Sequence, residues 1–101
     1  MMSTTRSSGG MVTAPHALAA QTGARILADG GNAIDAALGT AATLAVVYPH
    51  MTGLGGDSFW LIAEPGRTPL TIDGAGRAGA EVSVSFYRER GLSEEIGRAH
   101  V

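Results

Sequence analysis

The stretch GGNAIDAALGTAATLAVVYPHMTGLGGDSFWL, residues 30–61, decides the fold. In order, it predicts a helix start, an apolar helix, a glycine-rich turn and a strand. Asn32 is a favourable N-cap, and Asp35, three residues later, stands in for the glutamate of a capping box. Pro49 ends the helical run. We therefore expect a helix over residues 33–48, followed by a loop and a strand.

The expected helix is apolar on every face. Between Ala33 and Tyr48 only Asp35, Thr40 and Thr43 are polar. A helix of this kind is normally buried on all sides, so we expect it to be the central helix of a layered soluble domain. Its length of about 16 residues falls short of the roughly 20 residues that a membrane span needs, and no membrane partner is expected.

The composition narrows the class of protein. The chain has 101 residues, a net charge of −2 and no lysine, so it offers no basic surface for nucleic acid. The absence of cysteine excludes disulfides and thiolate chemistry. The opening residues MMSTTRSSGG lack the apolar segment of a signal peptide. We expect a cytoplasmic product, or a periplasmic or secreted one if the true start lies upstream.

The segment before the central helix predicts three features. Residues 1–10 are polar and small, which indicates a flexible N-terminus. Met11–Thr13 predicts a short strand. Apolar residues at helical spacing predict a helix over His16–Asp29, with Pro15 in its first turn and Gly30-Gly31 as its C-cap. The short turn between the two helices predicts a packed helical hairpin.

The segment after the central helix predicts a β-hairpin. Phe59–Ala63 and Leu70–Ile72 are the expected strands, joined by a turn-rich loop. Residues 73–79 predict a glycine-rich loop, and residues 82–90 a short helix with Ser83 as a cap and Gly91 as its stop. Two helices and two short strands cannot cover each other fully, so we expect a layer of structure to be missing.

The last residues, Glu95 to Val101, resemble the translation of a sequencing-library adapter. We interpret them as a non-native tail, the alternative being an ordinary polar C-terminus. Residues 11–94 then form the N-terminal part of one domain, and we expect the chain to be a fragment of a longer protein.

Two glycine-rich segments invite a ligand-binding interpretation. Gly74–Gly79 fits G-x-G-x-x-G after an expected strand, as in dinucleotide sites, but no well-formed helix is expected to follow it. A loop that carries an arginine is the favoured interpretation. Thr52–Asp57 lacks the Gly-Lys-Ser/Thr of a P-loop. Its glycines fit equally a tight turn and a backbone that approaches a substrate closely.

Few side chains suggest chemistry. His16, His50 and His100 lack metal-ligand spacing, so no metal and no cofactor is expected, and His50 is expected to cap helical carbonyls. No serine or threonine has the setting of a nucleophile, so no catalytic residue is assigned. Arg77 has the fork geometry to grip a carboxylate, although the pattern alone favours a surface arginine, paired for example with Asp73.

Two segments carry a family resemblance. MVTAPHALAAQTGARILADGGNAIDAALGTAATLAVVYPHMTGLGGDSFWLI and LTIDGAGRA resemble the N-terminal part of γ-glutamyltransferases, also called γ-glutamyltranspeptidases or glutathione hydrolases. The likeness spans roughly residues 10–87. It implies an α+β fold in which a helical hairpin is followed by a β-hairpin. This pair would be a portion of the four-layer αββα sandwich of N-terminal nucleophile hydrolases.

The resemblance also implies an activity. Family members are proenzymes that cleave themselves into a large and a small subunit, and the threonine that starts the small subunit is the nucleophile, with its own amino group as base. They cleave γ-glutamyl amides such as glutathione through an acyl-enzyme and pass the γ-glutamyl group to water or an amino acid. This chain matches only the early large subunit. We therefore expect it to be inactive alone and to need the rest of both subunits as partners.

One motif departs from the family pattern. Members with established γ-glutamyl specificity carry R-E-x-A-P after the second strand, and its arginine holds the substrate α-carboxylate. Aligned on Ala78, the arginine, glutamate and proline positions are Ala75, Gly76 and Gly79, while the arginine of this chain is Arg77. The resemblance implies Arg77 as a substrate contact. The loop residues that it implies as neighbours of the site are Gly53, Gly55, Gly56 and Asp57.

The departure leaves the substrate open. Another amide, as in the related cephalosporin acylases, is an alternative to a γ-glutamyl compound. Two alternatives outside enzymes are a nucleotide-binding module built on residues 74–79 and a helical-hairpin interaction domain that folds alone.

Overall fold

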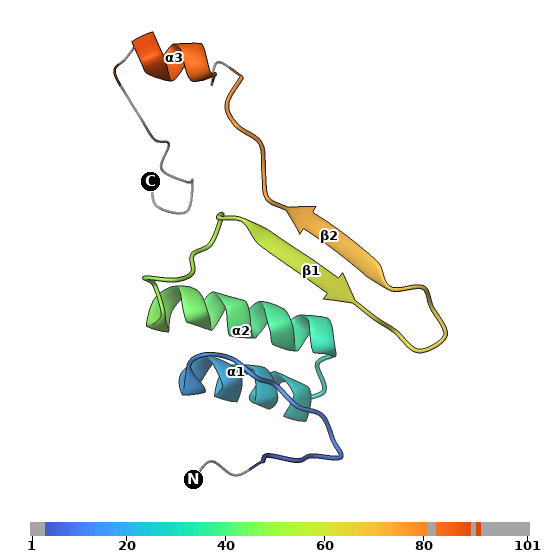
Figure 1. The fold of residues 1–101 in the computed structure, drawn as a ribbon. Coiled ribbons are helices and arrows are strands. Elements are labelled where there is room, and N and C mark those ends of the chain that lie inside the picture. Colours follow the sequence, from blue (N-terminus) through green and yellow to red (C-terminus); the bar gives the residue numbers. More distant parts are fainter. Residues whose placement is uncertain (1–3, 81–82, 90, 92–101) are drawn as a thin grey trace. The chain divides into compact units, whose positions relative to one another are not determined.

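The computed structural model describes residues 4–80, 83–89 and 91. In chain order it contains helices α1 (Ala17–Ala28) and α2 (Ala33–Val47), strands β1 (Ser58–Ile62) and β2 (Leu70–Gly74), and helix α3 (Val84–Glu89) (Figure 1). The chain divides into two compact units, Met1–Leu54 and Gly55–Val101. The predicted helical hairpin forms in the first unit and the predicted β-hairpin in the second. None of the described helices is long and apolar enough to cross a membrane.

Helix α1 ends at the predicted glycine pair. Gly30 has a φ of +98°, a conformation that glycine adopts without steric cost. Its N–H donates to the Leu27 carbonyl at 3.2 Å, and the N–H of Gly31 donates to the Ile26 carbonyl at 2.8 Å. These two bonds define a Schellman motif, which satisfies carbonyls that the helix end would leave unpaired.

Helix α2 begins with the predicted capping box. The Asn32 side chain accepts a hydrogen bond from the Asp35 N–H at 2.8 Å, and the Asp35 carboxylate accepts one from the Asn32 N–H at 3.1 Å. The two caps are adjacent in sequence, so the turn between α1 and α2 is specified almost entirely by local hydrogen bonds.

Two glycines bring α1 and α2 close together. A Cβ at Gly23 of α1 would collide with the Thr40 hydroxyl and would lie 2.8 Å from a methyl group of Val12. Gly39 of α2 lies in the same way against Ile26 of α1. A methyl group at Gly23 would have to displace Thr40 or Val12, whereas one at Gly39 would meet the end of the Ile26 side chain. The residues buried at the centre of this unit are Ala19, Gly23, Ala36 and Thr40.

The segment Met11–Thr13 is extended, but the expected strand does not form. Within the described residues its backbone pairs with no other strand, and the only ladder joins β1 to β2. Val12 instead packs across the point where Gly23 meets Thr40. A β-strand is stabilised by hydrogen bonds to the backbone of a neighbouring strand. Here the Val12 side chain packs against a helix instead.

The start of α1 also differs from the expectation. The helix begins at Ala17, so Pro15 lies before it rather than in its first turn. His16 is the N-cap, and its Nδ1 accepts a hydrogen bond from the Leu18 N–H at 3.1 Å. Since histidine is an uncommon N-cap, neither its spacing nor its neighbours indicated this role.

Helix α2 is buried on one face only, and the expectation of all-round burial is wrong for this chain. Ile34, Leu38 and Val46 are 38, 54 and 77% exposed. They recur at multiples of four residues and therefore form one apolar stripe along the helix. Helix α1 covers the opposite side, where Ala36 and Thr40 are buried.

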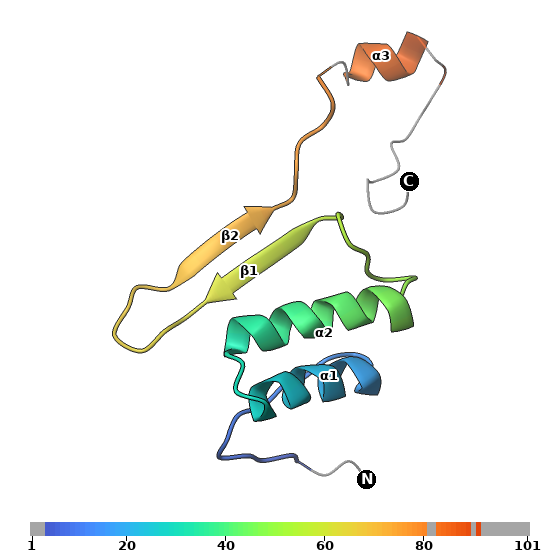
Figure 2. The same cartoon turned by 180° about the vertical axis from the view of Figure 1, so that it is seen from behind.

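Strands β1 and β2 form an antiparallel hairpin (Figures 1 and 2). Ser58 pairs with Gly74 at the open end, and Ile62 with Leu70 next to the turn. Gly74 therefore belongs to β2, although residues 73 and 74 were expected in a loop. A Cβ at Gly74 would lie 2.8 Å from the Ser58 carbonyl oxygen, so the pairing at this end requires glycine.

The hairpin buries little of its own apolar surface. Phe59 and Leu61 project from one face, since side chains two residues apart share a face, and they are 72 and 73% exposed. Leu70 and Ile72, on the other face, are also exposed. Two strands alone cannot cover either face.

Helix α3 follows the predicted signals. The Ser83 side chain accepts a hydrogen bond from the Phe86 N–H at 3.0 Å. Gly91 has a φ of +70°, and its N–H donates to the Arg88 carbonyl. Residues 82 and 90 of the expected helix lie outside the described residues, as do the suspected tail over residues 95–101 and His100.

Candidate functional site

The open end of the β-hairpin gathers most of the candidate residues. Because Ser58 pairs with Gly74, Asp57 immediately before β1 and Ala75 immediately after β2 are at the same end of the hairpin. The loop that carries Arg77 therefore leaves the hairpin where the glycine-rich loop enters it. The candidate residues in this unit are Gly55, Gly56, Asp57 and Arg77. Gly53 belongs to the other unit.

The loop before Arg77 has a defined course. The Asp73 carboxylate accepts a hydrogen bond from the Ala75 N–H at 3.0 Å, an Asx-type turn that reorients the chain at the end of β2. Gly76 has a φ of +74° and continues this change of direction. Arg77 follows with an exposed side chain. Arg77 thus follows directly after a turn formed by Asp73 and Gly76.

This geometry does not fit a dinucleotide fingerprint. Gly74 is the last residue of β2, and the next described helix, α3, begins at Val84. In the fingerprint, the glycines themselves open the helix whose N-terminus receives the phosphates. The G-x-G-x-x-G match of residues 74–79 is therefore a turn and not a nucleotide site.

In the loop before β1, Gly53 and Gly55 differ in whether the structure explains the glycine. Gly55 has a φ of +83°, so the turn itself requires glycine there. Gly53 has no such conformation, and among the described residues no atom lies within 4 Å of a Cβ built on it. Leu54, between them, is exposed. The turn explains Gly55, whereas neither the backbone nor a neighbour explains Gly53.

The described histidines have structural roles. His16 caps α1. The His50 ring packs edge-on against Tyr48, with ring centroids 4.4 Å apart and an interplanar angle of 72°, in place of the expected carbonyl cap. The described part of the chain contains no group of three or more histidine, cysteine or acidic residues that could hold a metal.

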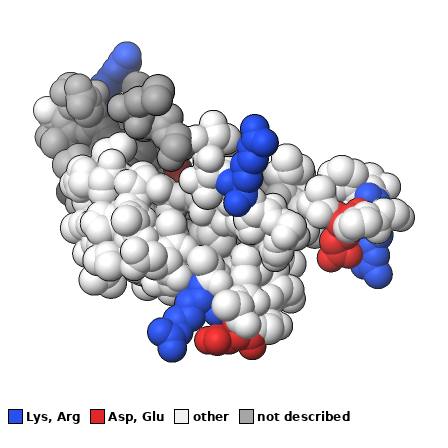
Figure 3. Space-filling view, turned by 90° about the horizontal axis from the view of Figure 1, so that it is seen from below, with Lys and Arg blue, Asp and Glu red and all other residues white. Residues whose placement is uncertain are grey.

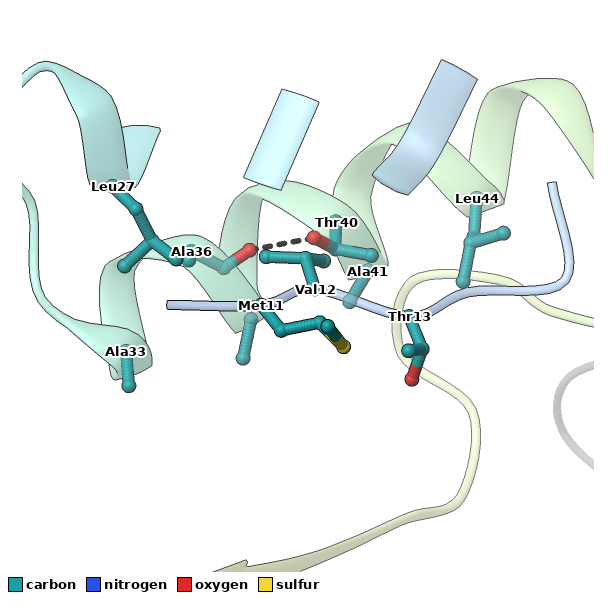
Figure 4. A pocket seen from close by; sticks show the side chains of 10 residues that line it. Met11, Val12, Thr13, Leu27, Ala33, Ala36, Thr40, Ala41 and Leu44 are labelled. Atoms are coloured by element: carbon teal, nitrogen blue, oxygen red, sulfur yellow. Dashed lines mark hydrogen bonds between the residues drawn. The ribbon is translucent and has the colours of Figure 1, made fainter. Parts of the chain in front are cut away.

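A groove of about 340 Å³ runs along α2 beside the extended segment Met11–Thr13 (Figure 4). Thr40 is a polar residue in its wall, and its hydroxyl donates to the Ala36 carbonyl at 2.7 Å, so the groove offers mainly apolar surface. The residues that line it are Met11, Val12, Thr13, Leu27, Ala33, Ala36, Ala37, Thr40, Ala41 and Leu44.

In the view of Figure 3, a few charged side chains lie among many uncharged ones. Arg25 pairs with Asp29 at 3.9 Å within the first unit, and Arg67 pairs with Glu64 at 3.4 Å in the hairpin turn. Exposed pairs of this kind contribute about 0–1 kcal/mol to stability.

The chain belongs to the gamma-glutamyltranspeptidase family, whose model matches residues 19–101. It is 51% identical over 87 residues to the oxamate amidohydrolase proenzyme of Klebsiella pneumoniae, covering 86% of this chain and 16% of that protein. It is 54% identical over 79 residues to the glutathione hydrolase-like YwrD proenzyme of Bacillus subtilis, covering 77 and 15%. The chain thus spans about one sixth of the length of these relatives.

Solved structures of the family share the fold. The gamma-glutamyltranspeptidase of Pseudomonas nitroreducens, complexed with L-DON, matches with a TM-score of 0.75 and 39% identity, covering 86% of this chain and 26% of that one. The Helicobacter pylori gamma-glutamyltranspeptidase matches with a TM-score of 0.77 and 29% identity, covering 84 and 24%.

These comparisons confirm the family and the fold class expected from the sequence. The helical hairpin and the β-hairpin are a portion of the N-terminal nucleophile hydrolase fold. The roles of Arg77 and of the loop residues Gly53, Gly55, Gly56 and Asp57 remain predictions.

Proposed function

We propose that this chain forms the N-terminal part of the large subunit of a gamma-glutamyltranspeptidase-like amidohydrolase. The complete protein would be a proenzyme that cleaves itself into a large and a small subunit. It would cleave γ-glutamyl amides such as glutathione through an acyl-enzyme on the first threonine of the small subunit, and pass the acyl group to water or an amino acid. The family match over residues 19–101 carries this proposal.

The exposed apolar surface supports a place inside a larger protein. Val46 on α2 and both Phe59 and Leu61 on β1 are largely exposed, and the groove along α2 is open. Each unit therefore exposes large apolar side chains of its own, and exposed apolar surface often marks an interface. We propose that the rest of the large subunit and the small subunit cover them.

Within this enzyme, we propose that Arg77 binds the carboxylate of the substrate. Its position at the open end of the hairpin and the defined turn before it support this role. A guanidinium binds a carboxylate through two parallel hydrogen bonds. Gly55, Gly56 and Asp57, which precede β1 in the same unit, would shape the same site.

A second candidate substrate is another small amide that carries a carboxylate. Ala75 stands where the γ-glutamyl-specific pattern has its arginine, and the similarity to an oxamate amidohydrolase extends over 86% of this chain. In oxamate the carboxylate is bonded directly to the amide carbon, whereas in a γ-glutamyl amide several carbons separate them. Arg77 could serve either substrate, and the distance from the carboxylate to the scissile bond would distinguish them.

The complete proenzyme tests both proposals. Self-cleavage is read from two bands on a denaturing gel, and amide cleavage is measured with γ-glutamyl-p-nitroanilide and with oxamate. We expect two subunits and activity on at least one substrate. An intact chain with no activity on any amide would contradict the proposed function, whereas activity on oxamate alone would select the second candidate.

The variant Arg77→Ala tests the carboxylate contact. We expect KM for the preferred substrate to rise roughly 10- to 100-fold, because a hydrogen bond to a charged group contributes about 1.5–3 kcal/mol. The control is Arg67→Ala, since Arg67 is an exposed arginine in the turn at the other end of the hairpin. An unchanged KM in Arg77→Ala, in an enzyme that remains active, would exclude the contact between Arg77 and the substrate carboxylate. The family assignment would still hold.

A further inference from the structure

We draw no further inference here: the strongest candidate, the apolar groove between the extended segment Met11–Thr13 and helix α2, carries none because nothing in the structure shows which segment or partner covers it.

Discussion

The helical hairpin and the β-hairpin differ in how far each specifies its own structure. The first has adjacent caps, a Schellman motif and a glycine-mediated contact around the buried Ala19, Ala36 and Thr40. The second has a regular register but exposed side chains on both faces, and isolated two-stranded hairpins are marginally stable in water. The difference indicates that the helical unit is stabilised largely by its own contacts, whereas the β-hairpin needs other parts of a protein to bury its apolar side chains.

The largest effect on the helical unit is expected at Gly23. In Gly23→Ala the new methyl group collides with Thr40 and Val12. Overpacking costs about 1–3 kcal/mol, which exceeds the gain from helix propensity of roughly 1 kcal/mol over most of that range. We expect a lower free energy of unfolding in urea, measured by circular dichroism.

Gly39→Ala is the matched control for that variant. Its new methyl group meets the flexible end of Ile26, which can rotate away, so we expect a smaller loss or a gain. Equal destabilisation by the two variants would contradict a clash with Thr40 and Val12 that is specific to Gly23.

The capping box should contribute the next largest effect. Asn32→Ala removes the acceptor for the Asp35 N–H and should cost about 1 kcal/mol. Asn32→Ser keeps a side-chain oxygen at the N-cap and should retain most of the stability. Thermal melts of the two variants compare them directly, and identical melts for Ala and Ser would contradict a capping contribution.

The smallest effect on the whole chain is expected in the β-hairpin. In Gly74→Ala the methyl group meets the Ser58 carbonyl oxygen and should disrupt the open end of the hairpin. We expect the two units to unfold independently, so the free energy of unfolding of the helical unit should change by less than about 0.5 kcal/mol. A loss as large as that of Gly23→Ala would show that the two units unfold together.

Sequence patterns predicted the parts of the fold that local interactions determine. The caps at Gly30, Asn32 and Ser83 depend on residues close in sequence and form as expected. The two hairpin strands also form, with ends that differ from the expected ones by one or two residues. The strand at Met11–Thr13 and the all-round burial of α2 depend on neighbours distant in sequence, and neither is present among the described residues. The pattern of apolar residues indicates which face of a helix is buried. It does not indicate which segment packs against that face.

The candidate site was predictable to a similar extent. Antiparallel pairing brings the residues around Asp57 and Arg77 to the same end of the hairpin, a consequence of the predicted strands. The turn made by Asp73 and Gly76 was not anticipated, because it depends on a side-chain hydrogen bond and a positive φ. No catalytic residue was assigned from the sequence, so the reaction geometry could not be predicted.

Amide hydrogen exchange of the purified 101-residue chain, resolved by residue, tests the central claim most directly. Exchange rates report the free energy of local opening. The account predicts slow exchange at the centres of α1 and α2 and exchange close to that of an unfolded peptide in β1 and β2. Equal protection of both units, lost together in a single cooperative transition, would contradict the claim that the hairpin needs cover from other parts of a larger enzyme.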